Sequence, residues 1–256
     1  MVPAVRAVFR ELLRRELEER YRGSLLGAAW LLVLPLLQLA VLAWVFGHLL
    51  PARAHGGALP YAAFLALGLW PWNLFANAAN RGVTALTDNA ALIGKVAVPH
   101  GLYVDTRVAA SVMVDLAGFV LVLGALLAFG LDLDLSGLPM AAAGLAVLAL
   151  YAFAAARLLA VLQVFLRDIA TVTGQCLVLG FFLTPVLYER SLLPAAAARW
   201  LGFNPLVLPV ETVRNALSGG AVDWLALGVS ALLGGALLVF ANIFFRRARS
   251  HLEDFL

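Results

Sequence analysis

The stretch from Leu25 to Ala52 contains no Asp, Glu, Lys or Arg, and it constrains the fold more than any other part of the chain. It is long enough for a helix to cross the hydrocarbon core of a bilayer, which takes about 20 residues. The composition extends this inference, since 63% of the 256 residues are hydrophobic and only 13% are charged. A soluble domain carries about twice that share of charge, so we predict that lipid is the solvent of this chain.

Charged, glycine-rich and proline-rich breaks divide the rest of the chain into further apolar segments. We predict an all-α integral membrane protein with six transmembrane helices, at about 27–49, 60–80, 107–129, 138–165, 170–188 and 224–245. Gly68 and Pro71 are expected to interrupt the second span. The predicted domains are a cytoplasmic amphipathic helix at residues 1–24 and a single transmembrane domain at residues 25–256.

The basic residues predict the orientation, because six spans put both termini on one side of the membrane. That side carries Arg6, Arg10, Arg14, Arg15, Arg20, Arg22, Arg81, Lys95, Arg107, Arg167, Arg246, Arg247 and Arg249, whereas the opposite loops carry Arg53, Arg190, Arg199 and Arg214. Loops rich in Lys and Arg stay in the cytoplasm. We therefore expect a multi-pass protein of the bacterial cytoplasmic (inner) membrane with both termini cytoplasmic.

The N-terminal segment has the pattern of an amphipathic helix. Its apolar positions and one acid recur at helical spacing with Arg and Glu between them: Val5, Val8, Phe9, Leu12, Leu13, Glu16 and Leu17. This pattern predicts a helix lying in the cytoplasmic membrane interface, the alternative being a solvated leader helix. The corner into the first span would be formed by Arg20, Arg22, Gly23, Ser24 and Gly27.

No cofactor site is evident in the sequence. The only Gly-Lys pair, Gly94-Lys95, is followed by Val96 and lacks the first glycine of a P-loop. If the protein uses ATP, another polypeptide supplies it. The four histidines show no metal-ligand spacing, and the single Cys176, which excludes an intramolecular disulfide, is expected to be buried.

Two further features bear on enzymes and nucleic acids. Asp132-Leu133-Asp134 resembles the acidic motif of sugar-nucleotide enzymes, but a polar turn capped by aspartates explains it better. The net charge of +3 does not indicate nucleic acid, because the basic residues cluster beside the apolar spans. The sequence therefore offers no catalytic constellation.

Asp115 and Arg157 are charges placed inside predicted spans, where an unpaired charge is costly. Counted from the cytoplasmic ends of the third and fourth spans, both lie about 12–15 Å deep. The two spans are antiparallel neighbours. We therefore predict a structural ion pair between them, in preference to a proton or substrate relay.

Six sequence blocks, in order from end to end, carry a family resemblance. They are RELEERYRGSLLGAAWLLVLP (15–35), GLWPWNLF (68–75), NAALIGKVAVP (89–99), VFLRDI (164–169), FFLTPVLYERSLLP (181–194) and NPLVLPVETVRNAL (204–217). The chain resembles the membrane subunit of bacterial ABC transporters that export polysaccharides such as lipopolysaccharide O-antigen, capsule and teichoic acid.

The resemblance implies a homodimer that works with two copies of a cytoplasmic ABC ATPase, which would hold the ATP and Mg. It implies a cytoplasmic coupling helix at about 84–95 that rides on the ATPase, with contacts from Asn89, Leu92, Ile93 and Lys95. It also implies re-entrant helices between spans five and six that close the outer end of a channel. The substrate would be a lipid-linked polysaccharide.

The residues themselves support a re-entrant element after the fifth span. Asn204-Pro205 is a favourable helix start, and the apolar segment through Leu217 is too short to span. Glu211 and Arg214, three residues apart, are expected to pair on its surface. These residues would form the outer gate.

Aromatic residues are the candidates for the channel wall, because sugars stack on aromatic rings. They are Trp70, Trp72, Phe75 and Tyr188. The alternative for Trp70, Trp72 and Phe75 is packing or interface anchoring, which we prefer for Phe75. For the whole chain, the alternatives are an ABC exporter of another lipid or drug-like substrate, a membrane enzyme acting on lipid-linked sugars, and a structural membrane subunit.

Overall fold

The computed structural model describes residues 3–20, 27–49, 60–93, 95 and 98–255, and every regular element within these ranges is helical. The helices are α1 (Pro3–Glu19), α2 (Trp30–Leu49), α3 (Tyr61–Val83), α4 (Ala90–Ile93), α5 (Gly101–Ala128), α6 (Leu138–Phe165), α7 (Ile169–Phe182), α8 (Ala195–Leu201), α9 (Val207–Leu217) and α10 (Trp224–Phe255). The predicted corner residues Arg22, Gly23 and Ser24 lie outside the described ranges.

Three helices in the described part of the chain are long and apolar enough to cross a membrane: Gly101–Ala128, Leu135–Phe165 and Trp224–Arg249. α6 has the bounds predicted for the fourth span. α5 begins before the predicted start at residue 107, because Asp105 and Arg107 both have ion-pair partners that let them join the helix. α10 continues past residue 245 to Phe255.

α2 and α3 occupy the positions of the first two predicted spans. α3 is continuous through Gly68 and Pro71, so the predicted interruption is wrong. The helix is buried on all sides, and Leu65, Leu67 and Leu69 are fully enclosed. Packing on every side holds the helix together where Pro71 has no amide hydrogen to donate.

α7 is shorter than the predicted fifth span, 170–188, because it ends at Phe182. The Tyr188 hydroxyl donates to the Phe182 carbonyl at 3.0 Å, and the Asn204 amide donates to the Leu183 carbonyl at 3.2 Å. Side chains from the next segment thus satisfy carbonyls that a continuing helix would have satisfied. α7 buries only Thr173 among its described side chains, and this marginal position leaves Cys176 exposed, contrary to the prediction.

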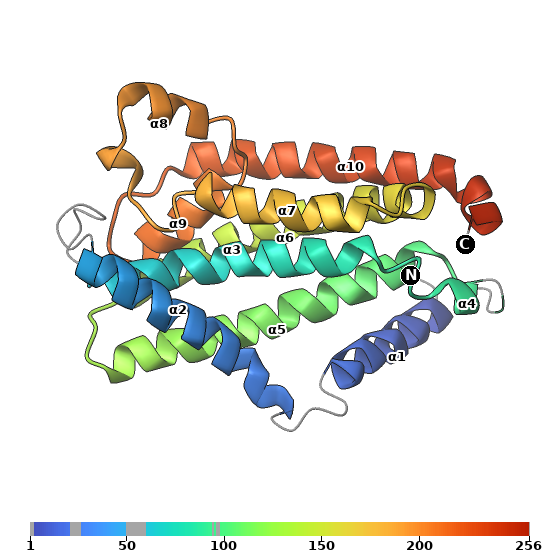
Figure 1. Ribbon diagram of the computed structural model, residues 1–256, viewed down its shortest axis with the longest axis horizontal. Helices are drawn as coiled ribbons and strands as arrows, with labels where there is room; N and C mark the ends of the chain where they lie inside the picture. The colour runs from blue at the N-terminus through green and yellow to red at the C-terminus, as the bar shows by residue number, and fades with distance from the viewer. Residues whose placement is uncertain (1–2, 21–26, 50–59, 94, 96–97, 256) are drawn as a thin grey trace.

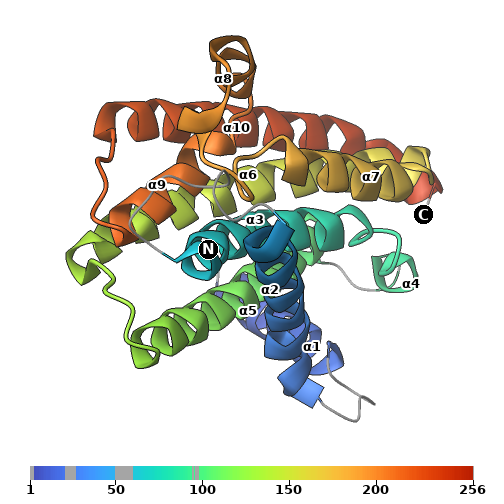
Figure 2. The same ribbon diagram turned by 60° about the vertical axis from the view of Figure 1, so that its left-hand side comes forward.

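The core lies where α3 and α6 meet. α6 contacts α3, α9 and α10, and α3 also contacts α5 (Figure 1). Figure 1 draws α4 and the C-terminus at one end of the bundle and α8 toward the other. We name these the α4 end and the α8 end. Figure 2 shows α8 projecting away from the bundle, with α1 on the side of α5.

The contact between α6 and α9 depends on a glycine. A Cβ atom at Gly137 would lie 1.8 Å from the backbone oxygen of Ala216, which no side-chain adjustment could relieve. The Asp134 amide also donates to the carbonyl of Leu217 at 2.9 Å. The segment before α6 is therefore held directly against the C-terminal turn of α9.

Candidate functional site

An ion network at the α4 end joins three helices. Glu16 of α1 accepts hydrogen bonds from Arg81 of α3 at 3.2 Å and from Arg107 of α5 at 3.1 Å. The side chain of Glu16 is 12% exposed and that of Arg107 is 13% exposed, so water screens the contact weakly. The exposed pair Arg14–Glu18 instead stays within α1, where the hydrogen bond to Glu18 raises the pKa of Arg14.

Arg107 extends this network to the segment that follows α3. It donates to the Asp88 carboxylate and, at 3.3 Å, to the Thr84 hydroxyl. The Thr84 hydroxyl itself donates to Asp88 at 2.8 Å. Sequence reasoning missed this network, although Glu16, an acid within an apolar stripe, was a signal for it.

The segment at 84–95, predicted as one coupling helix, is a run of turns followed by the short α4. Asn89 is buried and donates to the Ala85 carbonyl at 2.9 Å, and Ile93 is buried as well. Leu92 is partly buried against the core, and Lys95 is exposed. Asn89 and Ile93 therefore hold the segment in place, and the contacts of these four residues with an ATPase stay a prediction.

The predicted pair of Asp115 with Arg157 is also wrong. Arg157 binds Asp105 through two hydrogen bonds of 2.9 and 2.6 Å. The error lies in the depth of Asp115, which was counted from residue 107 although α5 begins at Gly101. Asp115 lies about 21 Å along α5, whereas Arg157 lies about 12 Å from the end of α6.

The hydrogen-bond partners of Asp115 are uncharged. Its carboxylate accepts from the Asn77 amide of α3 at 2.9 Å and from the Ser111 hydroxyl at 3.4 Å. These contacts make a buried polar link between α3 and α5, close to the middle of the bundle. The guanidinium groups of Arg20 and Arg81 also interact electrostatically with Asp115, and Arg81 belongs to the ion network of Glu16.

Arg214 ties α9 to the segment that follows α7. It is buried and donates to the carbonyls of Pro185 at 2.8 Å and Val186 at 3.0 Å. Its guanidinium carbon lies 3.8 Å from the centre of the Phe64 ring. The expected surface pair with Glu211 is wrong, because these carbonyls draw the guanidinium inward and leave Glu211 4.0 Å from Arg190.

The helix predicted from Asn204-Pro205 begins slightly later, at Val207. Asn204 accepts from the Leu206 amide at 3.0 Å, and it donates to the Thr184 hydroxyl at 3.0 Å. Pro205 is exposed in the turn before the helix. The Asn-Pro pair thus starts the helix and also joins it to the end of α7.

The aromatic channel candidates are mostly core residues within one chain. Trp70 is 2% exposed and packs against Gly118 of α5. Trp72 is 4% exposed, and its ring centre lies 6.0 Å from that of Phe75 and 6.2 Å from that of Phe181 in α7. The packing interpretation therefore holds for Trp70, Trp72 and Phe75, and only the half-buried Tyr188 reaches a surface.

The acidic motif at 132–134 lies in the connection before α6. Asp134 accepts from the Ser136 amide at 3.0 Å and caps the short 3-10 helix Leu135–Gly137, as expected for a polar loop capped by an aspartate. Within the described ranges, no three His, Cys, Asp or Glu side chains gather as metal ligands. The shielded charged groups Glu16, Arg107, Arg157 and Arg214 therefore connect separate segments of the chain to one another.

Comparison with known proteins identifies the class to which this bundle belongs. A family model described as ABC-2 type transporter matches residues 7–218, and the chain belongs to that family. Its members are transporter components rather than enzymes, and they imply an ABC ATPase as partner. Together with the apolar helices, the family indicates a multi-pass protein of the inner membrane.

The similar proteins are more specific. "O-antigen export system permease protein RfbA" of Klebsiella pneumoniae is 24% identical over 245 residues, covering 94% of this chain and 92% of that protein. A protein of the same name from Myxococcus xanthus is 31% identical over 207 residues, covering 79% of this chain and 76% of that protein. The family resemblance predicted from the sequence is confirmed.

Proposed function

We propose that this chain is the channel-forming subunit of an ATP-driven exporter that moves a lipid-linked polysaccharide of the O-antigen type across the cytoplasmic membrane. The observation that carries the proposal is the alignment over 94% of the chain with a protein named as an O-antigen export permease. The family model supports a transporter component over an enzyme. The buried polar groups Asp115, Arg157 and Arg214 connect separate segments of the chain to one another.

The proposed topology has six spans, formed by α2, α3, α5, α6, α7 and α10. The turns that follow α7 would complete its passage, because its 14 residues reach only about 21 Å. The α4 end would be cytoplasmic. It carries the basic residues Arg81, Lys95, Arg107, Arg167, Arg246, Arg247 and Arg249, whereas Arg190 and Arg199 lie near the α8 end.

The proposed assembly is a homodimer with two copies of a cytoplasmic ATPase that hold the ATP and Mg. In this assembly the ATPase would contact the exposed side of the segment at 84–95, including Ala91 and Lys95. Movement of this segment would reach α1, α3 and α5 together, because Arg107 and Glu16 connect all three to it. ATP binding would thus be transmitted to a path along the dimer axis.

The outer gate would be built from α8 and α9. Both helices are too short to cross a bilayer. α9 is packed against α3 and α6, whereas α8 projects from the bundle. Arg214 and Asn204 fix α9 to the end of α7, so a movement of α7 would carry the gate with it. This coupling supports a gate that opens together with the spans.

The test is deletion of the gene for this chain in its host, followed by complementation. Without the chain, an antibody to the surface polysaccharide should stain permeabilised cells but not intact cells. The wild-type chain should restore surface staining, and Lys95→Glu should restore less of it than Arg199→Glu, because the two exposed cations lie at opposite ends of the bundle. Surface staining of intact cells that lack the chain would contradict the proposal.

A further inference from the structure

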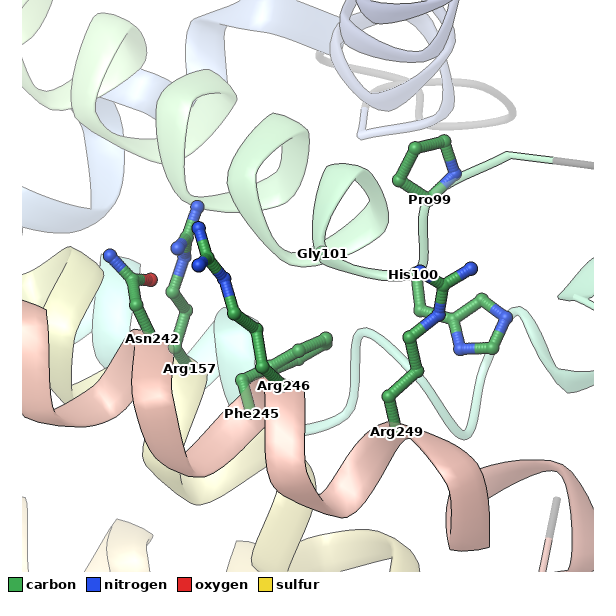
Figure 3. A pocket seen from close by; sticks show the side chains of 8 residues that line it. All are labelled: Pro99, His100, Gly101, Arg157, Asn242, Phe245, Arg246 and Arg249. Carbon is green, nitrogen blue, oxygen red and sulfur yellow. The ribbon is translucent and has the colours of Figure 1, made fainter.

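A cavity of about 230 Å³ lies at the α4 end, between the start of α5 and the last turns of α10. Arg157 of α6 reaches into it from the side (Figure 3). Its lining consists of Pro99, His100, Gly101, Arg157, Asn242, Phe245, Arg246 and Arg249. This site is separate from the ion network of Glu16 and Arg107, whose residues do not line it.

The lining is strongly basic, with three arginines and no carboxylate among its eight residues. Arg157 is neutralised by its two hydrogen bonds to Asp105. Arg246 and Arg249 lie three residues apart on one face of α10, and neither forms an ion pair with another described residue. Among the described side chains, these two positive charges in the cavity have no carboxylate partner.

The remaining groups suit an anion that also has an apolar neighbour. α5 has its N-terminus at Gly101, and the helix dipole places partial positive charge there. The Asn242 Oδ1 atom is buried and has no hydrogen-bond partner in the described part of the chain, so it can accept a hydrogen bond from a hydroxyl group of a ligand. Phe245 is 8% exposed and supplies an apolar wall.

We propose that this cavity binds a phosphate group, carried by the headgroup of an anionic lipid or present as a free phosphate. Two guanidinium groups match phosphate oxygens by paired hydrogen bonds, and they are more weakly hydrated than an ammonium. The cavity lies at the ends of α5 and α10, which are both apolar enough to span a membrane, and lipid headgroups are found at this level. The inference does not depend on which substrate is exported.

The first experiment compares lipids on the purified full-length protein in a non-ionic detergent. Native mass spectrometry should show phosphatidylglycerol retained in preference to phosphatidylcholine with the same acyl chains. The double variant Arg246→Gln/Arg249→Gln should lose this preference, with affinity at least about tenfold weaker. Arg247→Gln is the matched control, since it removes an exposed charge from the same helix outside the cavity, and it should bind as the wild type does.

A second arm replaces the lipid with soluble pyrophosphate, followed by thermal unfolding. Stabilisation of the wild type that is lost in Arg246→Gln/Arg249→Gln supports binding of a free phosphate, whereas the lipid result supports a headgroup. Asn242→Asp, which keeps the side-chain shape and adds a negative charge, should also weaken binding at least about tenfold. The proposal would be overturned if both lipids bound equally and pyrophosphate had no effect. It would also be overturned if Arg247→Gln weakened binding as much as Arg246→Gln/Arg249→Gln does.

Discussion

At the scale of single residues, Arg157 shows how this bundle accommodates a charge within an apolar helix. Its side chain is 24% exposed and that of Asp105 is 20% exposed, so the pair is shielded from water without being fully buried. The two parallel hydrogen bonds fix the geometry as well as the charge balance. The pair therefore joins α5 to α6 near the α4 end.

A double-mutant cycle of Asp105→Asn with Arg157→Gln tests this pair. The coupling energy should be about 1–2 kcal/mol, measured as unfolding free energy by denaturant titration in mixed micelles. The same cycle with Asp115→Asn in place of Asp105→Asn is the control and should show coupling within about 0.5 kcal/mol of zero. A larger coupling for Asp115 than for Asp105 would restore the pair predicted from the sequence.

Arg214 has a second kind of buried contact, in which neutral carbonyls satisfy a charge. Arg214→Met keeps the apolar stem but leaves the Pro185 and Val186 carbonyls without these donors. We expect a loss of about 2–4 kcal/mol in unfolding free energy. Arg199→Met, at an exposed position, should change it by less than about 0.5 kcal/mol, and equal losses in the two variants would contradict the assigned role.

Partners of individual charges were the least predictable feature of the chain. The positions of Asp115 and Arg157 along their helices follow from the sequence, but the choice of partner depends on where α5 begins. The spacing of Glu211 and Arg214 would allow an ion pair on the surface of one helix. In the structure Arg214 instead donates to backbone carbonyls in the segment after α7. Such acceptors appear only when the chain has folded, and spacing along one helix does not reveal them.

At the scale of elements, α1 is the helix whose attachment depends most on charge. Its Arg and Glu side chains are mostly exposed, and its apolar stripe is only partly buried, as the sequence pattern predicted. Glu16 interrupts that stripe and binds Arg81 and Arg107. The attachment of α1 to the bundle should therefore respond to this one carboxylate.

Glu16→Gln should loosen α1 without unfolding the bundle. Hydrogen–deuterium exchange of α1 peptides should become about tenfold faster, because two charge-assisted hydrogen bonds are weakened. Glu18→Gln, on the exposed face of the same helix, is the matched control and should leave α1 exchange near the wild-type rate. Unchanged exchange in Glu16→Gln would show that apolar contacts alone hold α1.

The sequence predicted where the helices lie better than it predicted the residues at which they end. α6 begins and ends as predicted, because Pro139 lies in its first turn and a charged break follows it. α7 stops short of its prediction since Tyr188 and Asn204 satisfy its last carbonyls, which hydropathy cannot show. The coupling segment keeps its place but only α4 within it is helical, as Asn89 bonds back to Ala85 in a turn.

At the scale of the whole molecule, the two ends of the bundle are held together differently. Ion pairs connect α1, α3 and α5 at the α4 end, whereas hydrogen bonds from Arg214 and Asn204 to backbone carbonyls hold α9 to α7 near the α8 end. In the proposed exporter, the charged end receives the ATPase and the other end closes the channel. The family resemblance already implied a coupling end and a gating end, whereas the contacts that hold each end together could be found only in the structure.

Transport by the purified complex tests the central claim most directly. The full-length chain and the ATPase encoded with it would be reconstituted in proteoliposomes that carry the host's lipid-linked polysaccharide in the leaflet facing the ATPase. Addition of ATP and Mg should move the glycan to the opposite leaflet, measured by its protection from or access to a glycosidase, and liposomes with the ATPase alone should show no movement. Movement without this chain, or none with the complete complex under hydrolysis of ATP, would contradict the account.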